Sequence, residues 1–400
     1  MLIRFVFAAL LLLLCSLCRA EESEPRLLWS TKVAGLREGC VAVSDGQVIA
    51  PVVRGNSVVS LDAATGKVQW TRTLTDTAPY PPILDEQSAY VVTGSCTLYR
   101  IERTKGRVTW SRWLAGSIQS MPTLGDGVVY AAASDTPQRA LRKGGWHLVC
   151  LEAAKGRERW AAPIGSDILG APLVVGGQVF VCTHDGILRA FDGANGKPLW
   201  TAEAGAVSMP VPHLDQVAVR TSLGLRAFAR ADGAEGGRWA PEVDRLPDRQ
   251  GKPVARVFRF PMLAGDRAYG TFDGGELACL DLSAGTATWT WSTGGEEPGE
   301  PVAVGGRVYF GTSRGTVVGL DARTGRALWA VRTDAVIADA PAVQDGALYF
   351  HDLNGGVIAV DAGTPTATGW GMWGGNTAHT GGWNPGQERT TETATGDDRK

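Results

Sequence analysis

Side chains that could do chemistry are sparse in this sequence. Its five histidines are never three or four residues apart, so the spacing of a helical zinc site is absent, and each is predicted to be a polar strand-end or loop residue. Beyond residue 20 no two cysteines are adjacent or form a CxxC pair, which argues against a metal cluster. The five cysteines beyond residue 20 are Cys40, Cys96, Cys150, Cys182 and Cys279. Their odd number excludes complete internal pairing, and the last three are interpreted as buried small residues.

A glycine followed by a basic residue recurs at Lys67, Arg107, Arg157, Lys197 and Arg326. A phosphate-binding loop also ends in Gly-Lys, but it needs an earlier glycine at a fixed spacing and a following helix, which are missing here. Each of these turns begins with an acidic residue, namely Asp62, Glu102, Glu152, Asp192 or Asp321. We therefore expect local charge compensation; a weakly basic ring on one face is the alternative.

Candidate oxygen ligands for a hard cation are Asp185, Asp352 and Asn354, which fall in predicted hairpin turns. Calcium needs several oxygens in one cluster, and a turn alone accounts for each of these three residues. A metal site is therefore not predicted.

The elements that must position these residues follow from a repeat. Tryptophan recurs every 39 to 41 residues, or after 50 where a repeat is longer. The marks are Trp29, Trp70, Trp110, Trp160, Trp200, Trp239, Trp289, Trp329 and Trp370. Nine marks bound eight repeats, of which the fifth is degenerate. Proline is a second marker, because Pro82, Pro172, Pro261 and Pro301 each stand 28 residues before their Trp.

Each repeat contains four short runs rich in β-branched residues, separated by glycine-containing turns. In the seventh repeat the runs are 302–304, 308–312, 316–320 and 327–331. Four antiparallel strands per ~40 residues are typical of a propeller blade, and a solenoid is the alternative. Residues 27–29 have the character of a fourth strand without its first three. We expect them to join the blade formed by 341–361 and so close the ring.

The repeat unit resembles a known family. Val308-Tyr-Phe-Gly311 followed by Leu320-Asp-Ala-Arg-Thr-Gly-Arg-Ala-Leu-Trp329 is similar to the repeats of pyrroloquinoline-quinone (PQQ) dehydrogenases and of their non-catalytic BamB-type relatives in outer-membrane protein assembly. The resemblance covers about residues 30–370 and implies an all-β, eight-bladed propeller of four-stranded antiparallel blades, of the quinoprotein type. It also implies that a belt of Trp side chains docks between blades: Trp70, Trp110, Trp160, Trp200, Trp239, Trp289 and Trp329.

The family's enzymes carry a disulfide between adjacent cysteines over the quinone and hold Ca²⁺ with Glu, Asn and Asp. This chain has no adjacent cysteine pair. Residues 369–381 resemble a segment that accompanies such repeats, and are interpreted as a strap over the last blade.

Two insertions are the best functional signal. One spans about 135–147, between the second and third strands of repeat 3, and contains Arg139, Arg142, Lys143 and Trp146. The other spans about 241–260, before repeat 6, and contains Arg245, Arg249, Lys252, Arg256, Phe258 and Arg259. Loops on a rigid scaffold often carry function, and Arg and aromatic residues are favoured in interfaces. We expect both insertions on one face, where they bind a partner; harmless variation in loop length is the alternative.

The ends of the chain suggest export. Residues 1–20 combine an early positive charge, an apolar stretch and small residues before Ala20, as in a secretory signal peptide. Neither Cys15 nor Cys18 has the usual surroundings of a lipidation site, so a periplasmic or secreted protein without a lipid anchor is predicted. Residues 21–385 are assigned to the propeller, and 386–400 to a disordered polar tail. No later stretch is long and apolar enough for a transmembrane segment, and the near-neutral charge does not suggest nucleic acid.

The sequence thus predicts a non-enzymatic scaffold that binds protein partners in the cell envelope and needs no cofactor. As the BamB resemblance implies, its role would be in envelope or outer-membrane protein assembly. Alternatives are a PQQ-dependent dehydrogenase or PQQ-binding relative with calcium, and a periplasmic propeller that binds a ligand or glycan in its channel.

Overall fold

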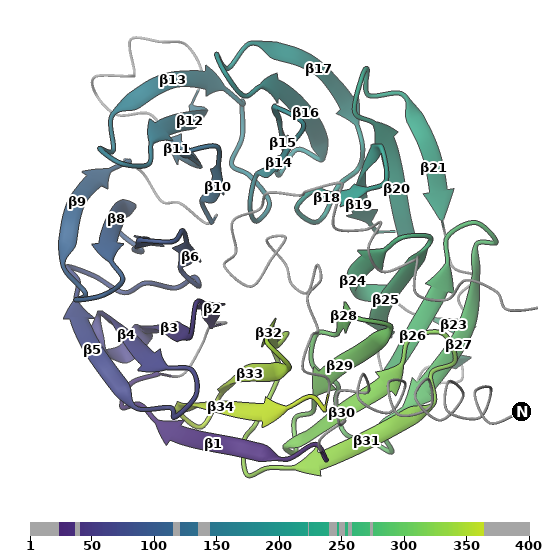
Figure 1. Ribbon diagram of the computed structural model, residues 1–400. Helices are drawn as coiled ribbons and strands as arrows, with labels where there is room; N and C mark the ends of the chain where they lie inside the picture. The colour runs from purple at the N-terminus through teal and green to yellow at the C-terminus, as the bar shows by residue number, and fades with distance from the viewer. Residues whose placement is uncertain are drawn as a thin grey trace, which may run out of the picture.

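The strands form a ring of eight four-stranded antiparallel sheets, arranged around a central axis (Figure 1). A computed structural model describes residues 24–36, 41–114, 121–134, 145–222, 224–239, 246–247, 253–254, 258–272 and 275–363. The predicted eight-bladed propeller is confirmed. The only helix in the described residues is a 3-10 turn, Val53–Gly55.

Each blade except the sixth begins with a short inner strand and ends with a longer outer one. Blade 1 consists of β2(Ala42–Ser44), β3(Gln47–Val52), β4(Ser57–Asp62) and β5(Val68–Thr73). Blade 2 consists of β6(Ile83–Leu84), β7(Ser88–Val92), β8(Thr97–Glu102) and β9(Val108–Trp113). Blade 3 consists of β10(Thr123–Gly125), β11(Val128–Ser134), β12(Trp146–Glu152) and β13(Glu158–Pro163). Blade 4 consists of β14(Leu173–Val175), β15(Gln178–Cys182), β16(Ile187–Asp192) and β17(Pro198–Glu203).

The second half of the ring repeats this arrangement. Blade 5 consists of β18(Val211–His213), β19(Gln216–Thr221), β20(Gly224–Ala229) and β21(Glu235–Trp239). Blade 6 consists of β24(Phe258–Ala264), β25(Arg267–Phe272), β26(Glu276–Asp281) and β27(Thr286–Ser292). Blade 7 consists of β28(Val302–Val304), β29(Arg307–Gly311), β30(Thr316–Asp321) and β31(Ala327–Arg332). Blade 8 takes β32(Ala342–Gln344), β33(Ala347–Asp352) and β34(Gly356–Asp361) from the end of the chain.

The ring is closed by β1(Leu27–Lys32), which supplies the outer strand of blade 8, as predicted. It pairs antiparallel with β34, from Leu27 opposite Val360 to Lys32 opposite Gly356. The Lys32 ammonium also lies 2.8 Å from the Asp352 carboxylate in the same blade. Joining the two ends of the propeller in one sheet removes the free strand edges that an open ring would expose.

Apolar side chains fill the spaces between blades. The middle strands are buried on both faces, because each blade is covered by the next; Tyr309 and Phe310 are neighbours on β29, and both are fully buried. The outer strands instead alternate between exposed and partly buried residues, as in β5. The thiols of Cys96, Cys150, Cys182 and Cys279 are free and buried, which confirms the core assignment of the last three. Cys40 lies outside the described residues.

At six of the eight seams, a tryptophan on an outer strand joins its blade to the next. Each indole N–H donates a hydrogen bond, 2.6 to 3.0 Å long, to a carbonyl in the turn between the third and fourth strands of the following blade. The pairs are Trp29 with Ala63, Trp70 with Arg103, Trp110 with Ala153, Trp160 with Gly193, Trp200 with Arg230, and Trp289 with Ala322. These bonds satisfy the polar atom of a largely apolar side chain.

A glycine in each acceptor turn lets the indole approach. The glycines are Gly66, Gly106, Gly156, Gly196, Gly233 and Gly325, all with φ between +63° and +76°. A Cβ added to any of them would lie 2.5 to 2.8 Å from the ring of the preceding blade's Trp. Both the backbone conformation and the close packing therefore require glycine.

Two predicted members of the belt differ. Trp329 packs over Gly319 of its own blade, and its buried N–H has no hydrogen-bond partner among the described residues. Trp239 is out of register: Ala227 pairs with Gly237, so Gly237 holds the position that Trp70 holds opposite Ser60 in blade 1. The Trp239 ring folds back over Gly237 and makes an edge contact with His213, so the belt assignment of Trp239 is wrong.

Candidate functional site

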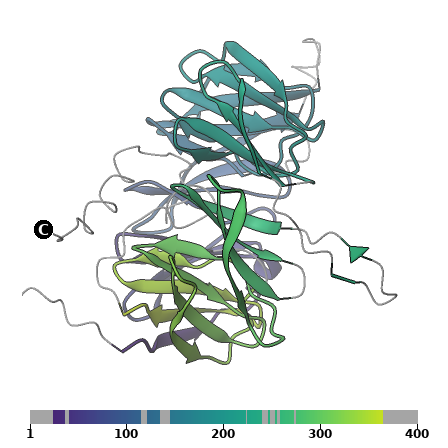
Figure 2. The same ribbon diagram turned by 90° about the vertical axis from the view of Figure 1, so that its right-hand side faces the viewer.

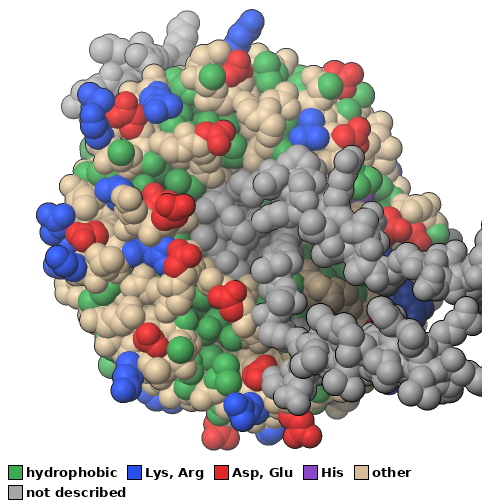
Figure 3. Space-filling model, in the orientation of Figure 1, with side chains coloured by type: hydrophobic (Ala, Val, Ile, Leu, Met, Phe, Trp, Pro, Cys, Tyr) green, Lys and Arg blue, Asp and Glu red, His purple; other side chains and the backbone are tan. Residues whose placement is uncertain are grey.

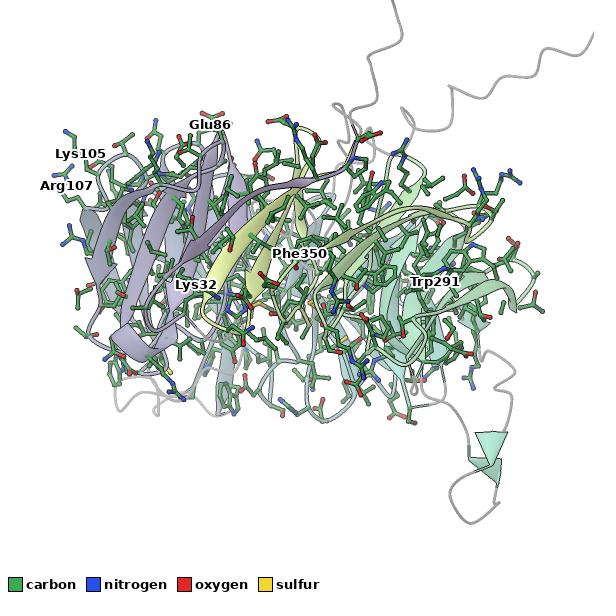
Figure 4. All side chains as sticks on the ribbon, turned by 90° about the horizontal axis from the view of Figure 1, so that it is seen from below. Lys32, Glu86, Lys105, Arg107, Trp291 and Phe350 are labelled. Carbon is green, nitrogen blue, oxygen red and sulfur yellow. The ribbon has the colours of Figure 1, made fainter. Side chains whose placement is uncertain are left out.

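The ring has two faces of different construction. On one, which we call the turn face, lie the turns between third and fourth strands that receive the tryptophans. On the other, the connector face, lie the loops from blade to blade and the loops between second and third strands. Backbone bonds join these two kinds of loop, as from His184 to Asp167 and from Leu353 to Val336, both 2.9 Å. Figure 4 shows Glu86, Lys105 and Arg107 on the turn face.

Two of the five turns predicted to compensate their charges locally form an ion pair within the turn. Arg107 pairs with Glu102 and Arg157 with Glu152, each at 3.1 Å. Figure 3 shows Lys and Arg side chains next to Asp and Glu on the face that it draws, without a continuous basic ring. The part of this face that is visible in Figure 3 thus carries charges of both signs side by side.

Both insertions begin at the connector face. The first starts after Ser134, the last residue of β11, and ends at Trp146, the first of β12. The second lies between Trp239 at the end of β21 and Phe258 at the start of β24. Seven of the residues named in the two insertions lie outside the described part of the chain: Arg139, Arg142, Lys143, Arg245, Arg249, Lys252 and Arg256. Their role as interface residues stays a prediction.

The described residues at the roots of the insertions differ in exposure. Trp146 is partly exposed and packs against the core cluster that contains Leu148 and Ile164. Phe258 is buried, with its ring 5.2 Å from that of Phe272, so it belongs to the core of blade 6 rather than to a partner-binding surface. Arg259 follows it on β24 and pairs with Thr271 through the backbone.

The second insertion contains a small sheet of its own. Strands β22(Leu246–Pro247) and β23(Pro253–Val254) pair antiparallel, with Leu246 opposite Val254. This pair, which we call the arm, lies away from the ring in Figure 2. In Figure 4 it lies on the opposite side of the ring from Glu86 and Lys105, and so on the connector face.

Between blades 7 and 8, Asp339 interacts with two other titratable groups, Glu300 and His351. Glu300 and Asp339 occupy neighbouring blade-to-blade connectors, and the Glu300 N–H donates to the Ala338 carbonyl at 3.1 Å. Burial, with a smaller effect of the Asp339 carboxylate, raises the pKa of Glu300 to about 7. Asp339 also contacts His351: the His351 Nδ1 atom lies 3.5 Å from the Asp339 Oδ2 atom, and the His351 side chain is 1% exposed. Sequence analysis missed this cluster, which can hold or release a proton near neutral pH.

Glu300 should make stability depend on pH. Its ordinary pKa is 4.5 and its folded pKa is about 7, so between these values the folded chain holds a proton that the unfolded chain has lost. Stability is therefore expected to fall as pH rises from 4.5 to 7, by about 2 kcal/mol after allowance for partial exposure. The Glu300→Gln variant should lose this fall, as measured by urea unfolding across that pH range. Glu297→Gln, at an exposed position of the same connector, is the control, and an equal pH profile for Glu300→Gln and the unmodified chain would contradict the assignment.

The candidate oxygen ligands are engaged in hairpin turns. Asp352 accepts bonds from Lys32 and from the N–H groups of Val336 and Asn354. Asp185 accepts hydrogen bonds from the Arg189 guanidinium and from the Thr183 hydroxyl. These bonds, of which the Arg189 bond has the larger effect, lower the pKa of Asp185 to about 2. In the described part of the chain no three His, Cys, Asp or Glu residues are grouped to hold a metal ion. These residues therefore do not fit the calcium site that accompanies PQQ.

A serine-nucleophile pattern, GxSxG, also occurs at Gly311–Gly315, but its context is not that of a hydrolase. The segment forms the hairpin between β29 and β30 instead of a turn from a strand into a helix. The Ser313 hydroxyl accepts a hydrogen bond from the Glu297 N–H at 3.1 Å. The serine is thus part of the loop pairing on the connector face.

Comparison with known proteins identifies the repeats. The family described as "Outer membrane protein assembly factor BamB" matches residues 19–137, 114–269 and 273–373. The chain belongs to this family. The BamB family match thus includes all eight blades and both insertions, and no individual curated protein matches the sequence. Within the described residues no helix has the length and apolar character that crossing a membrane requires.

Solved structures share the architecture at low identity. BamB from Moraxella catarrhalis is 17% identical, with a TM-score of 0.47, over 83% of this chain and 87% of that one. Quinohemoprotein alcohol dehydrogenase from Comamonas testosteroni is 14% identical, with a TM-score of 0.61, over 88% and 79%. Saccharomyces cerevisiae Sqt1 is 12% identical, with a TM-score of 0.64, over 85% and 98%. At these identities the similarity shows the propeller fold alone.

Proposed function

We propose that this protein is a non-catalytic propeller scaffold outside the cytoplasm that binds protein partners during the assembly of envelope or outer-membrane proteins. The observation that carries the proposal is its membership of the BamB family across the whole ring, from residue 19 to residue 373. The predicted signal peptide at 1–20, which lies outside the described residues, is consistent with export.

The connector face is the proposed binding surface. The six Trp bonds and the closing strand β1 make the ring a firm support for its loops. The arm and the partly exposed Trp146 lie on this face, and both insertions are rich in arginine. Aromatic and arginine side chains are enriched where protein interfaces gain most of their energy.

A second candidate function is a PQQ-dependent dehydrogenase. One observation favours it: Glu300, with a pKa of about 7, lies beside Asp339, and a group that exchanges protons near neutral pH would serve an oxidation. The engaged carboxylates of Asp185 and Asp352 argue against a calcium-assisted version of this chemistry.

Site-specific photo-cross-linking in intact cells tests the scaffold proposal. A photoreactive residue at position 254 of the arm should form a discrete adduct with an envelope protein. The same residue at position 105, on the turn face of blade 2, is the matched control and should form none. The expected contrast arises because only the arm lies on the proposed binding surface.

A titration with PQQ and Ca²⁺ separates the two candidates. At a few hundred times its Kd a bound cofactor stabilises the fold by about 3 kcal/mol, which is visible as a rise in melting temperature. A rise accompanied by dye-linked alcohol oxidation would establish the dehydrogenase and overturn the scaffold proposal. No rise, together with an adduct from position 254 but not from position 105, is the result that we expect.

A further inference from the structure

The seam between blades 5 and 6 lacks the indole that six other seams contain. Gly285 of blade 6 corresponds to the six glycines on which tryptophans pack, and it has the same conformation, with φ +70°. The turn is closed in the same way, because the Gly285 N–H donates to the Asp281 carbonyl at 2.8 Å, as the Gly66 N–H does to Asp62. Among the described residues, however, no atom lies within 4 Å of the position that a Cβ on Gly285 would occupy. We call this surface, Leu282–Gly285, the Gly285 slot.

The carbonyl of the slot also lacks a donor. Each of the six carbonyls that receive a tryptophan N–H receives a second donor from the same preceding blade, at 3.0 to 3.4 Å. This second donor is a Tyr hydroxyl at four seams and a Gln amide at two. The Leu282 carbonyl is the counterpart of these six, and no donor from the described part of the chain bonds to it. Leu282 is 4% exposed, and a backbone polar group in such a position normally has a hydrogen-bond partner.

The sequence of blade 5 accounts for both losses. Gly237 occupies the belt position and has no side chain to send across the seam. Trp239, two residues later, turns back over Gly237 instead of reaching the slot. Ala218 occupies the second-strand position of the tyrosines and has no hydroxyl, while Gln216, at the position of the glutamines, lies against Gly236. Blade 5 thus lacks the donors, whereas blade 6 keeps the turn that receives them.

What the slot accepts can be inferred from its six filled counterparts. Each holds the flat ring of a tryptophan against the glycine and bonds the ring N–H to the carbonyl three residues before that glycine. A larger residue at the carbonyl position does not prevent this, since two of the six carbonyls belong to Arg103 and Arg230. Tryptophan alone among the side chains combines a large apolar ring with an N–H that only donates.

The slot is partly open to solvent. Five of the six glycines that a tryptophan covers are buried, whereas Gly285 is partly exposed. Its neighbours Ser283 and Ala284 are exposed. A site for a side chain that comes from another molecule requires exposure of this kind.

We propose that the Gly285 slot binds a tryptophan side chain of a partner polypeptide, whose indole packs on Gly285 and donates its N–H to the Leu282 carbonyl. The proposal rests on the scaffold function, which requires a polypeptide partner. It adds to the connector face a second docking point, on the turn face of blade 6. The partner thereby supplies the contact that blade 5 lacks, so its binding strengthens the seam between blades 5 and 6.

Three glycine substitutions in the full chain test whether the slot is free of this chain's own side chains. Gly196→Ala places a methyl group 2.5 Å from the Trp160 ring, whereas Gly127→Ala meets no atom within 4 Å and carries only the strain of its φ of +73°. Gly285→Ala should lower the melting temperature only as much as Gly127→Ala. A fall as large as that of Gly196→Ala would mean that a residue of this chain already fills the slot, and the proposal is overturned.

A short peptide tests whether the slot accepts an indole. The probe is Gly-Gly-Trp-Gly-Gly with blocked ends and a fluorinated indole, observed by fluorine NMR as the purified full chain is added. Its signal should shift in a saturable way with the unmodified chain and with Gly127→Ala. Gly285→Ala should abolish the shift, because its methyl group takes the place of the ring. Methylation of the indole nitrogen removes the donor and should weaken binding about fivefold. No saturable shift, or an equal shift with Gly285→Ala, would overturn the proposal.

Failure of this proposal is distinguishable from failure of the scaffold proposal. The peptide experiment uses the purified chain and needs no envelope partner, whereas the adduct from position 254 reports binding at the connector face. An adduct from position 254 without a peptide shift would support the scaffold function and overturn the slot alone. Position 105 remains a valid control for that adduct, because it lies in blade 2, on the opposite side of the ring from blade 6 (Figure 1).

Discussion

Arg103→Met is expected to lower the free energy of unfolding by about 3 kcal/mol, the loss typical of a buried charged group whose partners stay behind. The side chain is 5% exposed and reaches three parts of the ring. Its guanidinium donates to the Asp45 carboxylate at 3.0 Å, the Gln47 amide oxygen at 3.1 Å, the Asp85 carbonyl at 2.8 Å and the Ser44 carbonyl. Methionine would fill the space and leave all four acceptors without this donor, and urea unfolding measures the difference.

The neighbouring turn provides the control. Arg107 also pairs with an acidic residue, Glu102, but its side chain is 72% exposed, so Arg107→Met should leave stability unchanged. Arg103→Lys should recover only part of the loss, because an ammonium cannot present the planar set of donors that four separate acceptors use. Equal stability of the Met variants at 103 and 107 would show that the buried network contributes nothing.

The role of Arg103 could be read from the sequence only in part. The residue after the acidic start of the turn is small in several repeats, as at Ala63, Ala153 and Ala322, so an arginine there is an irregularity. Its acceptors, however, lie more than 50 residues away in blade 1 or in another turn of blade 2. Such long-range contacts depend on how blades stack, which a repeat pattern does not specify.

Tryptophan spacing predicted the number of blades, the closing strand and most of the belt, because each seam imposes the same packing on the same repeat position. It assigned Trp239 wrongly for a physical reason. Residues two apart on a strand share a face, so Trp239 and the true belt position, Gly237, satisfy the same alternation. Only the backbone register, with Ala227 opposite Gly237, distinguishes them.

The Glu300 cluster shows that equivalent positions in consecutive repeats can become neighbours in space. Glu300 and Ala340 precede the prolines that stand just before the inner strands of blades 7 and 8, and the bond from the Glu300 N–H to the Ala338 carbonyl shows that these two connectors are neighbours. Proline spacing marks the blades but does not indicate which side chains become neighbours. The pKa of Glu300 depends on burial, which spacing does not reveal.

Trp29→Ala is expected to lower the free energy of unfolding by about 3 kcal/mol. This loss is at the lower end of the range for replacing a buried Trp by Ala, because the Trp29 ring is partly exposed. Trp29 closes the ring: its N–H bonds to the Ala63 carbonyl at 2.8 Å, and its ring covers Gly66 and lies 6.0 Å from Tyr349. The variant keeps the backbone pairing of β1 with β34 but loses the only indole that links blade 8 to blade 1 in the described residues. Hydrogen exchange of the amides of Leu27–Lys32 should therefore accelerate more than that of β9.

Trp113→Ala is the matched control, since Trp113 ends the outer strand of blade 2 but is 59% exposed and bonds only to Ser95 of its own blade, at 3.2 Å. Its loss should cost less than about 1 kcal/mol, as for most surface positions. Equal losses at 29 and 113 would mean that the cost is that of removing any large side chain, and that closure depends on the β1–β34 backbone pairing alone. A larger loss at 29, with faster exchange confined to β1, would show that the indole contributes to closure of the ring beyond the Thr31 and Tyr349 hydroxyls, which also bond to carbonyls of the same turn of blade 1.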